Sequence, residues 1–200
     1  MHLRDPNLPT DRDGFRFRGG HIALDLTATL AARAKAQPRE LLVEPAALLR
    51  WLDSAGMHAT DATEDDLQTA RALREAIYAL ALARIGGTDA PEARERINRV
   101  AAITPALPRL ESDGGVSLNS SADGMLATIA REAIFLFGSE RAAQIHQCQS
   151  DLCTLLFVDT SRRGDRRWCS MAGCGNRAKL ADFRRRHRQG RGAKALISSG

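Results

Sequence analysis

Four cysteines are the residues in this sequence whose type and spacing point most directly to a chemistry. Cys148, Cys153, Cys169 and Cys174 all fall within a 27-residue segment of the 200-residue chain. They form two pairs, each with four residues between its members, and 15 residues separate the pairs. Two close pairs separated by a hairpin-length gap are typical of a chain that folds four thiolates around one tetrahedral Zn²⁺.

The chemistry of these cysteines favours a structural metal. Thiolates are soft ligands that suit zinc, and the many arginines nearby lower thiol pKa values and so favour the metal-binding form. Four protein ligands leave no open position for a catalytic water, so we expect one structural zinc ion. Two disulfides, a redox-active dithiol and four unrelated free thiols remain alternatives at this point.

The elements that must position the cysteines can be read from the residues between them. Residues 155–159 form a short β-type run, 161–165 a turn, and 166–168 lead into Cys169. A helix is expected from about 175 to 187. This order of knuckle, β-hairpin, second knuckle and helix is that of a treble-clef zinc finger. Trp168 is expected to anchor the small core of this finger. One face of the helix is expected to pack on the hairpin and cover the zinc, and it carries Leu180, Phe183 and His187.

The charge of the chain is divided unevenly. Residues 161–200 hold ten arginines, two lysines and two aspartates, so they carry +10, whereas the whole chain carries +5. A helix with cations on most faces is typical of a segment that contacts phosphates. The predicted nucleic-acid-binding residues are Arg166, Arg167, Asn176, Arg177, Lys179, Arg184, Arg185, Arg186 and Arg188. Within this set, Arg177, Arg184 and Arg188 share one helix face, and Asn176 either caps the helix or contacts a base edge.

The remainder of the chain reads as a soluble helical domain. No apolar run reaches the roughly 20 residues of a membrane span, and the first 20 residues lack the apolar core of a secretory signal. We therefore expect a cytoplasmic protein with no membrane partner. Helices are expected over 21–35, after Pro45, from a capping box at Thr63 and Asp66 to Gly86, from Pro91, and from Ser121 or Asp123 to Gly138. A hairpin is expected between 107–111 and 116–119.

These elements define a mainly α (α+β) fold with two domains. A mostly helical regulatory domain, beginning at an edge strand over 15–18, is expected over residues 15–140. A zinc-binding domain is expected over 145–190, with flexible ends at 1–14 and 191–200.

Catalytic patterns are missing from the sequence. There is no glycine-rich phosphate loop, no GxSxG motif and no cluster of carboxylates. His21, His58 and His146 are scattered and are expected to be structural or surface residues. His21 and Asp25 lie one helical turn apart, a spacing typical of a surface salt bridge. We therefore expect that the protein is not an enzyme.

Two stretches resemble known families. Residues 167–179, with the run Cys174, Gly175, Asn176 and Arg177, are similar to the CGNR zinc-finger family, and the match extends over about 145–190. The preceding region resembles the stress-induced transcription regulator domain, with GG-x-x-ALDL at 19–26 and Leu-Arg-Glu-Ala at 73–76. That family commonly carries Asn-Thr where this chain has Ala28-Thr29. The resemblance implies four cysteine zinc ligands and DNA binding.

The sequence thus predicts a transcription regulator that binds duplex DNA through its zinc module. Two alternatives remain open: an RNA-binding protein, and a protein-interaction adaptor whose finger is purely structural. A small-molecule effector on the N-terminal domain and homodimerisation are further open predictions about partners.

Overall fold

The computed structural model describes residues 10–151 and 153–197, and for 118, 119 and 188–197 it describes the backbone alone. The N-terminal elements are β1 (Asp11–Arg12), β2 (Phe15–Arg16), α1 (Ile22–Thr27), β3 (Leu30–Ala31), β4 (Arg39–Glu40), α2 (Pro45–Ser54), β5 (His58–Ala59), α3 (Glu64–Gly86) and α4 (Pro91–Ala101). They are followed by β6 (Leu107–Leu110), β7 (Val116–Ser120), α5 (Ala122–Phe137), a 3-10 helix (Glu140–Gln144), β8 (Ile145–Gln147), β9 (Leu156–Val158), a π turn (Met171–Gly175) and α6 (Asn176–Ile197).

The helices begin and end where their capping residues predict. Thr63 accepts a hydrogen bond from the Asp66 N–H, and the Asp66 side chain accepts one from the Thr63 N–H, which completes the capping box of α3. Gly87 closes this helix in the left-handed conformation with φ 68°. Pro45 and Pro91 occupy the first turns of α2 and α4. The predicted mainly helical fold, including the β6–β7 hairpin, is confirmed.

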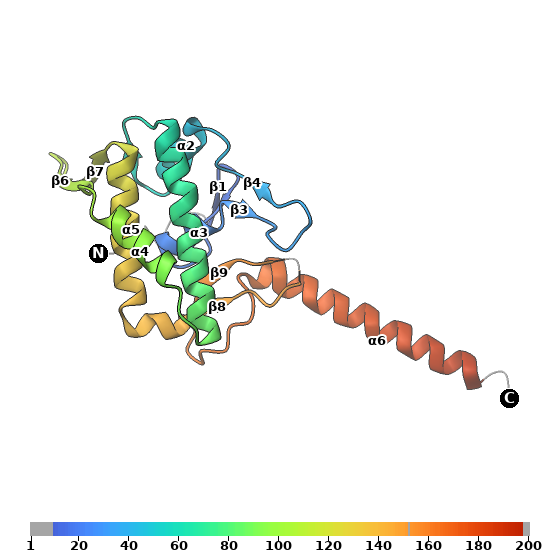
Figure 1. Cartoon of the computed structure of the whole chain (residues 1–200). Coiled ribbons are helices and arrows are strands. Elements are labelled where there is room, and N and C mark those ends of the chain that lie inside the picture. The colour runs from blue at the N-terminus through green and yellow to red at the C-terminus, as the bar shows by residue number, and fades with distance from the viewer. Residues whose placement is uncertain (1–9, 152, 198–200) are drawn as a thin grey trace.

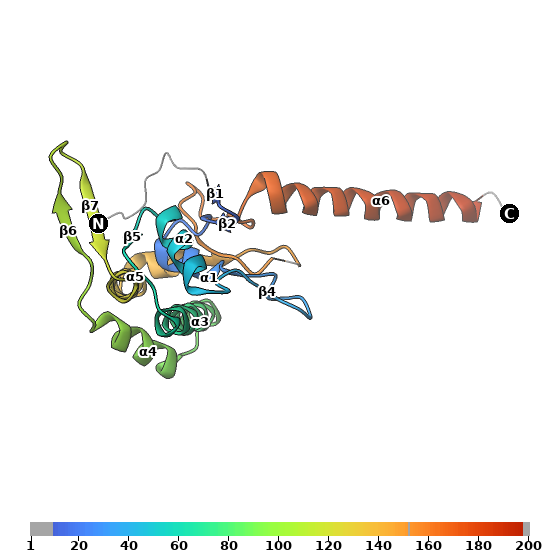
Figure 2. The ribbon, with the colours of Figure 1, turned by 90° about the horizontal axis from the view of Figure 1, so that it is seen from above.

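Helices α3 and α5 pack against α1, α2 packs on α3 and α5, and α4 also packs on α3 and α5 (Figures 1 and 2). All six residues of α1 are buried, and one apolar core extends from Phe17 and Trp51 through α3 to Met125 and Leu126 of α5. Because α1 is fully buried and packs against α3, α5 and β9, this short helix lies inside the N-terminal domain.

The first predicted helix, 21–35, is wrong in its length. The hydroxyls of Thr27 and Thr29 donate to the carbonyls of Leu24 and Leu26 at 2.6 and 2.7 Å. The chain then turns into β3, which pairs with β4, and Ala32 takes a left-handed φ of 57°. Threonine hydroxyls that bond nearby carbonyls compete with helix continuation, so α1 ends at Thr27.

His21 and Asp25 are buried, so the expected surface salt bridge is wrong. The His21 Nδ1 caps α1 by accepting a hydrogen bond from the Ala23 N–H at 3.3 Å, and its Nε2 lies 3.6 Å from a carboxylate oxygen of Glu132. Asp25 is 1% exposed and accepts a hydrogen bond from the Gly19 N–H at 2.7 Å. Both side chains fix the entry of α1 into the core.

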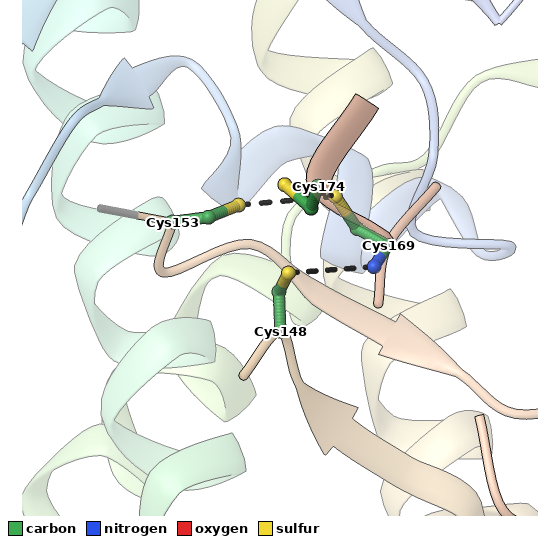
Figure 3. Close-up of side chains that lie close together, drawn as sticks. All are labelled: Cys148, Cys153, Cys169 and Cys174. Atoms are coloured by element: carbon green, nitrogen blue, oxygen red, sulfur yellow. Dashed lines mark hydrogen bonds between the residues drawn. The ribbon is translucent and has the colours of Figure 1, made fainter. Parts of the chain in front are cut away.

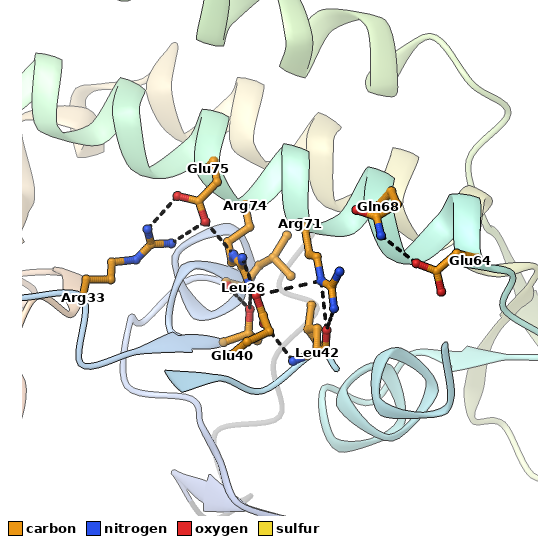
Figure 4. Close-up of polar contacts among 10 residues, drawn as sticks. Leu26, Arg33, Glu40, Leu42, Glu64, Gln68, Arg71, Arg74 and Glu75 are labelled. Carbon is orange, nitrogen blue, oxygen red and sulfur yellow. Dashed lines mark hydrogen bonds and ion pairs between the residues drawn. The ribbon is translucent and has the colours of Figure 1, made fainter. Parts of the chain in front are cut away.

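An ion-pair network joins the β3–β4 hairpin to α3 (Figure 4). Arg74 of α3 is 4% exposed and binds the two carboxylate oxygens of Glu40 at 2.6 and 2.8 Å. Its Nε also donates to Glu75, which is held in addition by Arg33 at 2.6 Å. Because a buried guanidinium is costly without partners, this pairing is needed to place Arg74 in the interior.

Secondary structure extends into both of the ends that were predicted to be flexible, and their flexibility stays a prediction. Asp11–Arg12 forms an antiparallel pair with Phe15–Arg16, and α6 continues through Ile197. Residues 1–9 and 198–200 lie outside the described part of the chain.

Strand β9 connects the N-terminal domain to the cysteine-rich segment. Its side chains alternate, as those of a strand do: Leu156 and Val158 belong to the core of the helical domain, and Phe157 belongs to a second cluster around the cysteines. The Val158 N–H donates to the carbonyl of Gly19 at 2.8 Å, and a Cβ on Gly20, whose φ is +71°, would lie 3.7 Å from the Val158 carbonyl. The two domains therefore share a strand.

Candidate metal centre

The loop between β8 and β9 supplies two of the cysteines, and the segment that leads into α6 supplies the other two. Cys148 directly follows β8, and Cys153 precedes β9 at the other end of the same loop. Cys169 ends an extended segment, and Cys174 lies in the π turn that leads into α6 (Figure 3). The Ser170 hydroxyl begins this turn by accepting a hydrogen bond from the Gly173 N–H at 3.2 Å. The spacing of four residues thus lets both pairs point inward.

The sulfur atoms form a cluster of the size that zinc requires. All four Sγ atoms lie within 4.8 Å of one another. The Cys169 Sγ lies 3.8 Å from that of Cys153 and 3.6 Å from that of Cys174. Four thiolates about 2.3 Å from a tetrahedral zinc are about 3.8 Å apart. A disulfide needs about 2.05 Å, and all four cysteines are free. The residues therefore fit one zinc ion and do not form disulfides.

Crowding sets the protonation of these thiols in opposite directions. Hydrogen bonds from Cys153 and Cys169 to the Cys148 sulfur lower the pKa of Cys148. The same contact raises the pKa of Cys153 to about 11, and contacts with Cys148 and Cys153 raise the pKa of Cys169. Negative charge is thus favoured on the Cys148 sulfur and disfavoured on those of Cys153 and Cys169. A divalent cation removes this conflict because it stabilises several adjacent thiolates at once.

Donors from the protein surround the sulfur cluster. The Cys169 N–H donates to the Cys148 Sγ at 3.4 Å, and a guanidinium nitrogen of Arg177 donates to the Cys174 Sγ at 3.0 Å. Such contacts orient ligands and offset the excess negative charge of a four-thiolate site. Arg177 was predicted to contact a phosphate, and its bond to the Cys174 sulfur was not predicted. Its position three residues after Cys174, on the same side of a helical turn, was the available signal.

A small apolar cluster, here called the finger core, covers the sulfurs. It contains Cys148, Leu155, Phe157, Cys169 and Cys174, with Ala28 and the half-buried Trp168 packed against it. The inward position of Trp168 agrees with its expected role as an anchor. The presence of Ala28, which follows α1, means that the N-terminal domain closes one side of the metal centre.

The predicted β-hairpin within the finger has a different partner strand. Residues 156–158 do form a strand, but β9 pairs with β8 and not with 166–168. The segment after β9 is closed instead by Asp159, which is 3% exposed and accepts hydrogen bonds from the N–H groups of Ser161 and Arg166, both at 2.8 Å. This carboxylate turns the chain back toward Cys169 without a β-ladder.

The expected apolar cover of the zinc by α6 is wrong. Leu180 and Phe183 are 55% and 54% exposed. Helix α6 points away from the body along its own axis, so residues beyond its first turns do not reach the finger core (Figure 1). The Phe183 ring packs on His187 of the same helix, with ring centroids 4.1 Å apart.

The predicted nucleic-acid-binding residues fall into two groups. Arg166 is turned into the finger, where its guanidinium donates to the carbonyls of Trp168 and Cys169 and lies over the Phe157 ring at 4.3 Å. The Asn176 Nδ2 donates to the Ala172 carbonyl at 3.3 Å, one turn earlier in the chain. These contacts make both residues part of the finger scaffold.

The second group is exposed. Arg167 binds Gln149 at 2.6 Å beside Trp168, and Arg185 and Arg186 contact Asp182. Asn176 of the first group is exposed as well, and the exposed members of the second group are Arg167, Arg177, Lys179, Arg184, Arg185 and Arg186. The side chain of Arg188 lies outside the described part of the structure.

The chain thus has two parts that share strand β9. The first is a helical domain, and the second is a four-cysteine centre followed by a basic helix. These features define the class of two-part, zinc-binding proteins. Comparison with known families assigns both parts. Residues 20–140 match the ABATE family, described as "putative stress-induced transcription regulator", and residues 144–187 match the CGNR zinc finger. The first match covers more than half of the chain, so the protein belongs to the ABATE family and carries one structural zinc in a CGNR finger. The comparison with curated proteins gave no match.

Membrane association through a helix finds no support in the described residues, because none of their helices is long and apolar enough to cross a bilayer.

Proposed function

We propose that this protein is a cytoplasmic, non-enzymatic transcription regulator that binds duplex DNA through α6. The observation that carries the proposal is the projection of a cationic helix, anchored at its N-terminus by the zinc centre, into solvent (Figures 1 and 2). Between 176 and 197 the sequence has six arginines, two lysines and one aspartate. Such a helix has few intramolecular partners for its charges, and phosphates can supply them.

The dimensions of α6 support binding in the major groove. Its 22 residues give a length of about 33 Å at 1.5 Å per residue, and the major groove of B-DNA admits an α-helix. Arg177 and Arg184 are seven residues apart on one face, and Lys179 and Arg186 are seven apart on the opposite face. Cations on both sides of the helix can contact the phosphates of both strands that border the groove.

The charge-based proposal is tested by the salt dependence of binding. The zinc-loaded full chain is titrated against a fluorescent duplex by anisotropy over a series of salt concentrations. If about six phosphates are neutralised, log K falls against log salt with a slope near −5. Arg184→Gln should reduce the slope by about one, and Arg96→Gln, an exposed arginine of α4, should leave it unchanged. A slope near zero refutes nucleic-acid binding by α6.

Single-stranded RNA is a second candidate because α6 exposes an aromatic side chain. Phe183 is 54% exposed, and aromatic rings stack on unpaired bases. Competition between duplex DNA and single-stranded RNA of the same length separates the two candidates. If Phe183→Ala weakens RNA binding and RNA displaces the duplex, the RNA proposal replaces the DNA proposal. Binding of an acidic protein with neither nucleic acid bound supports an adaptor instead.

A further inference from the structure

A cavity of about 480 Å³ lies between the N-terminal domain and the finger. Its walls are the end of β2, the β3–β4 hairpin with the turn before it, the residues after Cys153, and the first turn of α6. Pockets for small organic ligands have volumes of about 300–1,000 Å³ and often lie between domains. The cavity therefore has a suitable size and position for a small molecule.

The cavity is strongly cationic. Arg16, Lys35, Arg39 and Arg177 line it, and its lining contains no aspartate or glutamate. Within the described residues, the side chains of Arg16, Lys35 and Arg39 make no hydrogen bond or ion pair.

The neighbouring charged residues on the same hairpin behave differently. Arg33 and Glu40 are taken up by the ion pairs with α3 (Figure 4). The hairpin thus pairs its charges on the side that faces α3 and leaves Lys35 and Arg39 without partners among the described residues on the side that faces the cavity, where Arg16 of β2 is a third unpaired cation. Like charges gathered around one cavity repel each other, and an anion in the cavity would relieve that repulsion.

Part of the lining of the cavity is apolar. Ala28, Leu30, Ala31 and Leu155 contribute to it, and Leu155 also belongs to the finger core. An inorganic anion would pair with the cations but would leave the apolar part of the lining exposed to water. A ligand that combines a phosphate or carboxylate with a hydrocarbon part would use both, because burial of apolar area adds to charge pairing.

We infer that this cavity is a binding site for a small organic anion, shared between the N-terminal domain and the zinc finger. Arg177 lines the cavity and also donates to the Cys174 Sγ at 3.0 Å, and Cys153 forms part of the wall. An occupant that contacts Arg177 therefore touches the support of the metal centre. Binding of the ligand should therefore slow the removal of zinc by a chelator, in addition to being detectable by calorimetry.

The test uses phenyl phosphate as the probe and the zinc-loaded full chain in a calorimetric titration without nucleic acid. Phenyl phosphate is expected to bind more tightly than inorganic phosphate, which lacks the apolar part, and than phenol, which lacks the charge. It should also slow zinc loss to a chelator. Lack of binding at millimolar phenyl phosphate, or equal binding of all three compounds, overturns the inference.

Charge removal assigns the binding to this cavity. The double variant Lys35→Gln, Arg39→Gln should weaken phenyl phosphate binding about tenfold, since it removes two charge-assisted contacts. Both side chains are exposed and without partners, so the fold should remain intact. Arg109→Gln, an exposed arginine on β6, is the matched control and should not change the affinity. Unchanged binding in the double variant overturns the assignment.

A nucleic-acid phosphate is the competing occupant. If the double variant weakens binding to a duplex while phenyl phosphate neither binds nor competes, the cavity belongs to the nucleic-acid interface and the inference is wrong. Because phenyl phosphate binding is measured without nucleic acid, failure of the DNA proposal leaves this result standing, and the reverse also holds.

Discussion

Replacement of Cys174 by serine should unfold the finger while leaving the shared strand β9 in place. The apolar contribution of the finger core is small: full burial of Leu155 and Phe157 stabilises by about 1.5–3 kcal/mol each, together about 5 kcal/mol. Structural zinc contributes about 10–16 kcal/mol in zinc-finger peptides. The metal is thus the larger stabilising term, and a hydroxyl is a poor substitute for a thiolate ligand.

Hydrogen exchange can separate the two regions. The Gly175 N–H donates to the Ser170 carbonyl and the Cys148 N–H to the Leu155 carbonyl, and both bonds lie around the sulfur cluster. The Val158 N–H donates to Gly19 of the N-terminal domain. In Cys174→Ser we expect fast exchange at Gly175, retained protection at Val158, and the loss of one equivalent of zinc by elemental analysis.

A matched control distinguishes loss of the metal from a local defect. Met171 lies in the same π turn and is 54% exposed, so Met171→Ala should keep both the zinc and the protection of Gly175. The reasoning is refuted if Cys174→Ser retains one zinc with a protected Gly175. Equal loss of protection at Val158 would show that β9 depends on the metal and not on the helical core.

Three further changes test the packing of the N-terminal domain. Arg74→Met should lower the free energy of unfolding by about 2–3 kcal/mol in urea at pH 7, because it leaves carboxylates without their partner; an unchanged midpoint contradicts this. Burial raises the pKa of Glu40, but the hydrogen bonds from Arg74 and from the Leu42 N–H, together with the charges of Arg74 and Arg71, outweigh burial and hold that pKa below its usual value. Because the pKa of Glu40 is lower in the folded protein than in the unfolded chain, where it is near 4, this carboxylate stabilises the fold at pH values above about 4. The stabilisation should disappear as the pH falls through the folded pKa. The difference in unfolding free energy between wild type and Arg74→Met should therefore become smaller in acid. Thr63→Ala should cost about 1 kcal/mol through loss of the cap of α3, whereas no change would mean that the cap is dispensable. Gly19→Ala should destabilise by about 1–3 kcal/mol in thermal unfolding, since its Cβ would lie 2.8 Å from the Leu24 Cβ; a wild-type midpoint would mean that the backbone yields there.

Local signals were sufficient for the long helices and for the cysteines. Thr63, Pro91 and Gly87 mark helix ends through hydrogen bonds and backbone angles that depend on few neighbours. The spacing of the cysteines identified the metal centre because a tetrahedral ion restricts the geometry to few solutions.

Features that depend on distant partners could not be read from the sequence. The alanine-rich stretch after Thr27 has helical propensity, but the pairing of β3 with β4 overrides it. The strand partner of β9 lies before the first cysteine and not after it, and the sequence contains no local signal for that choice. The exposure of Phe183 follows from the direction in which α6 leaves the finger, which its amphipathic pattern does not determine.

The shared strand has a consequence for any attempt to isolate the finger. A fragment beginning near residue 144 would retain all four zinc ligands but carry Ile145, Leu156 and Val158, whose neighbours belong to the helical domain. Without that domain, these three side chains would form an exposed apolar patch on an otherwise charged peptide. The fragment would therefore tend to self-associate even with zinc bound. Limited proteolysis should accordingly cleave the chain within α6 more readily than at the boundary between the N-terminal domain and the finger.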